Sequence, residues 1–247
     1  MKIAVTGKGG SGKTTIAGSL ARHLARRGHQ VVAMDADPNP NLGLALGLAP
    51  DEVEAMVPIL NALLASGFTH DDPKPDPEDL LRRYGIAAPD GVVLVATGKI
   101  ERPTASCLCC GSHNTTRELF AELHGSGRVV VADLEAGLND LLWAQPGPDD
   151  LVLVVAEPSA KAVEIARRAC RIAEGMGVQR VVGVANRSTG RGEGERLAEV
   201  LGVEVFVVPE DPAVEMANHL GRAPLDADGS APAVVAIGRL AEQLLPR

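Results

Sequence analysis

Nine residues near the start of the chain have the types and spacing needed to hold a chain of phosphate groups. The segment G-K-G-G-S-G-K-T-T, residues 7–15, follows a short apolar run and precedes a segment of helical period. Glycines let a loop wrap a phosphate so that backbone N–H groups point inward, and the following helix adds its positive end. The sequence therefore predicts a phosphate-binding loop of the P-loop type. Its expected nucleotide contacts are Gly9, Gly10, Ser11, Gly12, Lys13, Thr14 and Thr15.

Three side chains of this loop have distinct expected roles. Lys13 places its charge against the β and γ phosphates, the Thr14 hydroxyl binds Mg²⁺, and Thr15 donates to the α phosphate. The alternative is a glycine-rich turn that binds no ligand. The expected cofactors are therefore ATP or ADP with Mg²⁺.

Carboxylates close two later apolar runs. Asp35 and Asp37 stand in M-D-A-D-P-N-P-N-L-G, and Asp133 stands in R-V-V-V-A-D-L-E-A-G-L. The carboxyl ends of parallel strands are where open α/β sheets bind ligands. An aspartate that ends an apolar strand is the Walker B arrangement, which predicts that Asp133 holds Mg²⁺ directly or through water. For D-P-N-P-N, the alternative is an Asx turn with no chemical role.

Three of the four cysteines fall in S-C-L-C-C-G-S-H-N, residues 106–114. In a reducing compartment a tight cysteine cluster is more often a metal or redox site than a disulfide framework. Cys107, Cys109 and Cys110 are the candidate ligands. The alternatives are a site completed within one subunit with His113, or cysteines at a helix start that bind no metal. Cys170 lies on an apolar helix face and is expected to be buried.

Short β-branched runs alternate with longer segments of helical period, which is typical of βα units and a mainly parallel sheet. Aromatic residues are only 2% of the 247, so the core is expected to be aliphatic. The sequence predicts one P-loop ATPase domain over residues 1–247, a doubly wound α/β sheet of about seven or eight strands flanked by helices. Strands are expected at 3–6, 31–35, 92–96, 129–133, 151–156, 180–185 and 203–208. Helices are expected near 14–27, 53–64, 115–123, 160–175, 192–201, 212–220 and 231–245, with an exposed acidic, proline-rich connection over 71–79.

Charge and hydropathy limit the classes of partner. The formal net charge of −8 argues against a general nucleic-acid or membrane-surface role, because a polyanion would be repelled. The first residues carry no signal-peptide pattern, and no apolar run approaches the ~20 residues that span a bilayer. We expect a cytoplasmic protein that binds neither nucleic acid nor membrane.

A second lysine, Lys8, at the front of K-G-G-S-G-K-T-T resembles the deviant Walker A loop of the ATPases that include nitrogenase iron protein, MinD, ParA and the arsenite-pump ATPases. The resemblance implies that Lys8 reaches across a dimer interface to the partner's nucleotide. It also implies that Asp37 positions or deprotonates the attacking water and that Asp35 lies near the Mg²⁺ shell. The alternative for Lys8 is a solvated surface lysine. Segments matching the group's switch II and its purine contacts are residues 134–137, Asn186, Pro209, Glu210 and Asp211.

Over essentially its full length the chain most resembles the CooC-type nickel-insertion ATPases of carbon monoxide dehydrogenase. The likeness rests on the loops above, the C-x-C segment, D-L-E-A-G-L, and P-E-D-P-A-V-E-M-A-N-H-L-G-R-A-P-L-D near the end. It implies a homodimer in which Cys107 and Cys109 of each subunit meet to bind nickel, zinc or an iron–sulfur cluster. The family usually has proline directly after the second cysteine, where this chain has Cys110. That departure leaves the cargo and the client open.

These observations predict a Mg²⁺-dependent ATPase that delivers nickel, another metal or a cluster to a metalloenzyme such as carbon monoxide dehydrogenase. One alternative is an electron-transfer ATPase with an iron–sulfur cluster that bridges the dimer. The other is a positioning ATPase of the MinD or ParA type. MinD-like proteins carry a basic amphipathic C-terminal helix, whereas this chain ends R-L-A-E-Q-L-L-P-R, which is short and not basic.

Overall fold

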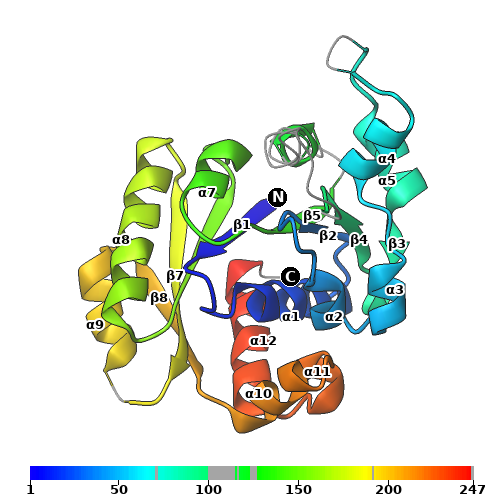
Figure 1. Cartoon of the computed structure of the whole chain (residues 1–247). Coiled ribbons are helices and arrows are strands. Elements are labelled where there is room, and N and C mark those ends of the chain that lie inside the picture. The colour runs from blue at the N-terminus through cyan, green and yellow to red at the C-terminus, as the bar shows by residue number, and fades with distance from the viewer. Residues whose placement is uncertain (70–71, 100–114, 116, 123–126, 191, 246–247) are drawn as a thin grey trace.

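The computed structural model describes all of the chain except residues 70–71, 100–114, 116, 123–126, 191 and 246–247 (Figure 1). Eight strands form one sheet in the order β3-β4-β2-β5-β1-β6-β7-β8. Every neighbouring pair is parallel except β3 and β4, which are antiparallel. The strands are β1 (Lys2–Gly7), β2 (Val31–Asp35), β3 (Ile86–Ala87), β4 (Val93–Ala96), β5 (Val129–Asp133), β6 (Leu151–Ala156), β7 (Arg180–Ser188) and β8 (Glu204–Pro209).

The central strands are buried on both faces, as their continuous Val, Ile, Leu and Ala runs require. Successive side chains of a strand point to opposite faces. Ile3 and Val5 accordingly belong to one hydrophobic core, and Ala4 belongs to the other. The doubly wound α/β architecture is therefore confirmed, together with all seven predicted strands.

Helices cover the two faces of the sheet (Figure 1). One layer holds α1 (Lys13–Arg26), α2 (Leu42–Leu46), α3 (Pro50–Glu54), α10 (Pro212–His219), α11 (Pro224–Ala227) and α12 (Pro232–Leu244). The other holds α4 (Ile59–Ala65), α5 (Pro77–Tyr84), α7 (Asn139–Ala144), α8 (Ala160–Gly175) and α9 (Glu193–Leu201). A short 3-10 helix, η1, spans Pro89–Gly91. Among the described residues, no helix has the length and apolar character needed to cross a membrane.

Two predictions about the segment between β2 and β4 are wrong. The single helix expected over 53–64 is split into α3 and α4, because the residue before Pro58 is biased away from helical geometry. The connection expected over 71–79 already contains the start of α5. Asp76 caps that helix by accepting from the Glu78 N–H (3.1 Å), and Pro77 takes its first position.

The other helices lie where the periodicity places them. Residues 115 and 117–122 are helical within the expected 115–123 segment, of which residues 116 and 123 lie outside the described part. Short elements that the sequence did not reveal are α2, α7, α11 and the two-residue β3.

A buried arginine joins three elements behind the phosphate loop. Arg22 of α1 is 2% exposed. Its guanidinium donates to Asp90 of η1 and to Asp226 of α11, each at 2.6 Å. This pairing holds α1 against the segments on both sides of it.

Candidate functional site

The candidate site lies at the middle of the sheet, at the carboxyl end of β1. The neighbours of β1 in the sheet are β5 and β6. After β1 the chain builds one half of the sheet, with β2, β4 and β5, and it then crosses to the other side of β1 to build β6, β7 and β8. Ligands of open α/β sheets bind at such a reversal of strand order. The phosphate loop joins β1 to α1 at this place.

Gly12 sits where only a glycine fits. Its φ is +92°, and a Cβ built on it would lie 2.2 Å from the side-chain nitrogen of Asn186. Asn186, which is 7% exposed, donates through Nδ2 to the Ser11 carbonyl at 2.7 Å. The end of β7 therefore holds the phosphate loop in place, a contact that the sequence did not reveal because the two segments are far apart along the chain.

Lys13 lies among carboxylates at the loop. It is 8% exposed, and its Nζ donates to the Lys8 carbonyl at 3.5 Å. Burial lowers the pKa of Lys13, while the charges of Asp133, Asp37, Asp140 and Glu135 act in the opposite direction. A charged lysine in this position is suited to bind an anion such as a phosphate group.

Thr14 and Asp133 form the part of the site that suits Mg²⁺. Asp133 is 3% exposed, is hydrogen-bonded to the Thr14 side chain, and has one oxygen, Oδ1, with no partner among the described residues. Burial raises the pKa of Asp133 to about 6. An orphaned buried carboxylate oxygen beside a hydroxyl is a donor set that a hard divalent cation prefers. The residues present therefore fit Mg²⁺.

Asp35 and Asp37 hold the turn after β2. Asp35 pairs in register with Asp133 on the neighbouring strand and is fully buried. Its two oxygens accept from the N–H groups of Asp37 (3.1 Å) and Leu42 (2.8 Å). Burial, then the charge of Asp133, raises the pKa of Asp35 to about 8. Asp35 is thus engaged in fastening the turn.

The Asx turn considered for D-P-N-P-N is present. Asp37 accepts from the Asn39 N–H through Oδ1 at 2.8 Å. Asp37 also lies close enough to Lys13 and Asp133 to influence their pKa values. The structure therefore brings Asp37 to the phosphate loop, as the sequence predicts, and gives it a local structural contact as well.

Lys8 is paired within its own chain. Its Nζ lies 3.1 Å from Oε1 of Glu157, the residue after β6, and this contact lowers the Glu157 pKa. The other Glu157 oxygen lies 4.0 Å from Arg187, which donates to the Gly10 carbonyl at 3.1 Å. Glu157 and Arg187 were missed by sequence reasoning. The signal for Glu157 was a carboxylate following the strand next to β1.

A hollow of about 180 Å³ lies beside the loop, where the purine contacts were expected. Its lining includes Gly12, Thr15, Asn186, Pro209 and Glu210. The geometry thus brings the predicted purine-contacting segments together with the loop.

Asp211 also lines this hollow, but its carboxylate is used for structure. It caps α10 by accepting from the Ala213 N–H and accepts from the Ala233 N–H, both at 3.0 Å. The side chain therefore fixes α10 against the start of α12.

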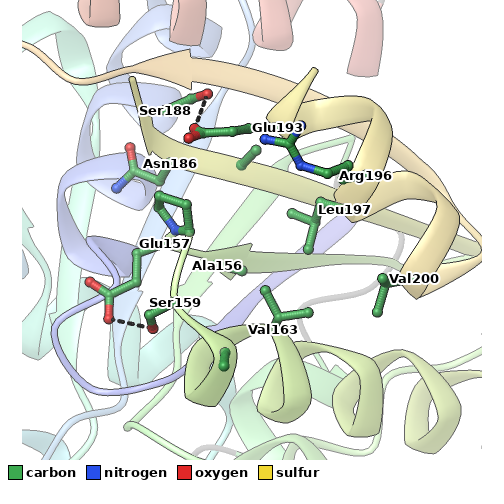
Figure 2. A pocket seen from close by; sticks show the side chains of 13 residues that line it. Ala156, Glu157, Ser159, Val163, Asn186, Ser188, Glu193, Arg196, Leu197 and Val200 are labelled. Carbon is green, nitrogen blue, oxygen red and sulfur yellow. Dashed lines mark hydrogen bonds between the residues drawn. The ribbon is translucent and has the colours of Figure 1, made fainter. Parts of the chain in front are cut away.

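A second hollow, of about 260 Å³, opens between the ends of β6 and β7 (Figure 2). Figure 2 shows the hydrogen bonds from the Ser159 hydroxyl to Glu157 and from the Ser188 hydroxyl to Glu193. Their oxygen–oxygen distances are 3.2 and 2.7 Å. Val163, Leu197 and Val200 supply apolar lining. Because Glu157 lies on its rim, this hollow borders the Lys8 pair.

The segment after β5 is tied directly to the end of β1. Gly137 donates its N–H to the Gly7 carbonyl at 3.2 Å, and the Thr6 hydroxyl donates to the Gly137 carbonyl at 3.3 Å. α7 follows, and it carries Trp143 with 40% of its surface exposed. The backbone of Gly137, in the predicted switch II, is therefore hydrogen-bonded to the end of β1, where the phosphate loop begins.

The cysteine segment, with Cys107, Cys109, Cys110 and His113, lies outside the described residues. Cys170 is 1% exposed, as predicted, and burial raises its pKa to about 11. Within the described part of the chain, no group of three or more metal-ligating side chains occurs.

Comparison with known proteins agrees with this geometry. The model of the CobQ/CobB/MinD/ParA nucleotide binding domain matches residues 2–225. The ATP-binding protein MJ0823 of Methanocaldococcus jannaschii, itself uncharacterized, is 32% identical over 247 aligned positions, covering 94% of this chain and 93% of that protein. The carbon monoxide dehydrogenase accessory protein CooC of Rhodospirillum rubrum is 31% identical over 198 positions, covering 76% and 74%.

Among solved structures, the septum site-determining protein MinD of Pyrococcus horikoshii, complexed with Mg-ADP, superposes with a TM-score of 0.77 over 99% of this chain and 96% of that one. At 20% identity this likeness concerns the fold. The family match covers most of the chain and includes the phosphate loop, both aspartate-ended strands and Asn186. The chain therefore belongs to the CobQ/CobB/MinD/ParA family of nucleotide-binding domains.

Proposed function

We propose that this protein is a Mg²⁺-dependent ATPase that works as a homodimer and delivers nickel, or another metal or cluster, to a metalloenzyme such as carbon monoxide dehydrogenase. The observation that carries the ATPase part is the phosphate loop at the switch point of the sheet: the buried Lys13 lies within the electrostatic influence of Asp133, whose Oδ1 has no partner in the described part of the chain. The relation to CooC supports the delivery role. The transported metal is cargo, distinct from the Mg²⁺ of the nucleotide site.

Each residue of the site has a task in this proposal. Thr14 and Asp133 hold Mg²⁺, which neutralises charge on the β and γ phosphates when bound. Lys13 binds those phosphates, and Asp37 orients the attacking water. Asp35, with both oxygens engaged by backbone N–H groups, keeps the turn that carries Asp37 in shape. Asn186 positions the loop from β7.

In the dimer, Lys8 adds its charge to the partner's nucleotide, as an arginine finger does. Cys107 and Cys109 from each subunit supply four thiolates, enough to close a tetrahedral site. Hydrolysis changes the segment around Gly137, and the dimer rearranges to release the metal.

The burial of α12 excludes this helix as a membrane-binding element. The apolar face of α12 is buried, including Val234, Ile237, Leu240 and Leu244, and it packs in the core with α1. A helix that lies on a membrane needs that face free.

ATP hydrolysis by the full-length protein tests the first half of the proposal. Replacement of Lys13 by Ala should lower turnover by ~100-fold or more, because the phosphates lose a preorganised charge. Lys161→Ala, an exposed lysine of α8, is the matched control and should keep wild-type turnover. Turnover that survives Lys13→Ala would sink the phosphate-loop assignment.

Metal content tests the second half. Anaerobic protein is analysed with and without ATP as the wild type, as Cys107→Ser/Cys109→Ser, and as Cys170→Ser. The double variant should lose the metal, whereas Cys170→Ser should retain it. Metal that stays with the double variant contradicts a site made by these cysteines, and a brown protein identifies an iron–sulfur cluster as the bound species.

A further inference from the structure

A third hollow, of about 260 Å³, opens beside the first turn of α1. Its polar lining comes from Thr14 and Thr15 of α1, Asn41 before α2, and Asn218 and Arg222 from the region of α10. Neither Asn218 nor Arg222 has a role in the nucleotide site as described so far. The phosphate-loop threonines thus line a hollow together with residues from α10 and the segment that follows it.

This hollow shares lining residues with the hollow of about 180 Å³ beside the loop, where the purine contacts were expected. Thr15 and Asn218 line both of them, and the Thr15 hydroxyl donates to Asn218 Oδ1 at 3.3 Å. A ligand with its base among Asn186 and Pro209 and its terminal phosphates at Lys13 must pass Thr15. The part of the nucleotide that passes there is the segment around the α phosphate.

Arg222 has a fixed backbone and an uncommitted side chain. Its N–H donates to the Ala217 carbonyl at 2.9 Å, which closes the end of α10. Its guanidinium has no hydrogen-bond or ion-pair partner among the residues that the structure describes, whereas Arg22 and Arg187 both have acceptors. A guanidinium presents a planar fork of donors that matches phosphate oxygens. Arg222 is exposed and lines the same hollow as Thr15. A guanidinium that has no acceptor among the described residues is free to bind an anion that enters this hollow.

We propose that Arg222 is a further nucleotide ligand and that its guanidinium contacts the α phosphate of the ATP or ADP bound at the phosphate loop. This inference rests on the proposed nucleotide site and extends it to the α10 side. The Thr15–Asn218 hydrogen bond joins the α1 side of the hollow to the α10 side.

Calorimetric titration of the full-length protein with ATP, ADP, AMP and adenosine, in the presence of Mg²⁺, tests the assignment. Arg222→Ala should weaken ATP, ADP and AMP by the same factor, about tenfold for a charge-assisted hydrogen bond, and leave adenosine unchanged. Arg222→Lys should recover part of the loss, because it keeps the charge and loses the fork. Arg196→Ala, an exposed arginine on the rim of the hollow in Figure 2 with no partner among the described residues, should bind all four ligands as the wild type does.

Three outcomes would overturn the proposal: unchanged affinities in Arg222→Ala, a loss confined to ATP, or an equal loss for adenosine. The melting temperature of Arg222→Ala without nucleotide should equal that of the wild type, so that a loss of affinity reflects contact and not folding. Failure of the nucleotide site itself has a different signature, because the wild type and Lys13→Ala would then bind ATP equally poorly.

Discussion

At the residue scale, the site is defined by a cluster of buried ionisable groups. Asp35 and Asp133 are neighbours in register at the ends of β2 and β5, and burial raises the pKa of both. Lys13 is the buried cation among them. Such an arrangement lowers the stability of the protein without ligand. It favours the binding of a ligand that brings Mg²⁺ and phosphate charge together.

This charge arrangement predicts a pH dependence with a definite sign. Between pH about 4 and about 8 the native protein binds more protons at Asp35 and Asp133 than the unfolded chain does, so these groups make stability fall as pH rises. Asp133→Asn removes one titrating group and lowers the pKa of the other. In Mg²⁺-free buffer, the loss of melting temperature from pH 5 to pH 8 should be smaller in this variant than in the wild type.

The same variant should lose Mg²⁺-dependent ATP hydrolysis. Asp149→Asn, at an exposed aspartate, controls for the change in net charge and should follow the wild type in both measurements. A variant Asp133→Asn with the full wild-type pH slope would show that this carboxylate is not the source of the effect.

At the scale of elements, contacts between distant segments shape the phosphate loop. Gly12 and Gly28 have nearly the same φ, +92° and +93°, but only Gly12 faces another side chain within 4 Å. Alanine at either position strains the backbone by ~1 kcal/mol. Gly12→Ala must also displace Asn186, so it should cost more stability and weaken ATP binding.

The difference between the two variants isolates the role of Asn186. Chemical denaturation and ATP titration of Gly12→Ala and Gly28→Ala measure it directly. Equal effects of the two substitutions would mean that the Asn186 contact does not constrain the loop.

Arg22 provides the second prediction at this scale. Arg22→Met removes the buried partner of Asp90 and Asp226, whose own side chains are 21% and 47% exposed, and should lower the free energy of unfolding by about 2 kcal/mol. Arg26 also contacts Asp90, at 3.0 Å, but its side chain is 45% exposed. Arg26→Met should therefore cost less than ~1 kcal/mol. Similar losses in denaturant titrations of the two variants would contradict the special role of the buried arginine.

The sequence predicted those elements whose signals are local. β1, β5 and β6 are continuous apolar runs, and α1, α8 and α9 are each followed by a glycine of positive φ, namely Gly28, Gly177 and Gly202. The secondary-structure prediction failed where the sequence pattern of an element was short or was assigned to a loop. The D-P-E-D run begins α5, and β3 is too short for any periodicity.

The sequence predicted those parts of the candidate site that are formed by residues consecutive in the chain. The loop and Asp133 are of this kind. Asn186 as a clamp on Ser11, and Glu157 as the partner of Lys8, depend on which strands become neighbours. Strand order is set by the packing of the whole sheet, so no local pattern encodes these contacts.

At the scale of the whole molecule, the Lys8–Glu157 ion pair opposes the formation of the proposed dimer. Lys8 must leave Glu157 to reach a partner's nucleotide. Glu157→Gln removes the charge that retains it, so the variant should dimerise with ATP at lower protein concentration. Its hydrolysis rate at limiting protein should rise by up to about fivefold, the range of a partly exposed ion pair.

Sedimentation with ATP and turnover measured over a range of protein concentrations check this expectation. Glu164→Gln is the matched control, because Glu164 is paired with Arg167 and Arg168 on the outer part of α8. A decrease of turnover in Glu157→Gln would show that Glu157 assists the reaction, in contradiction to a restraining role.

The partly exposed indole of α7 gives this protein an optical handle. Trp143 is the only tryptophan of the 247 residues, and its helix begins two residues after Gly137, whose backbone is bonded to the end of β1. All tryptophan emission therefore originates from one place, adjacent to the segment that a γ phosphate is proposed to move. The unlabelled protein can thus report on its own nucleotide cycle in real time, through the color and intensity of a single fluorophore.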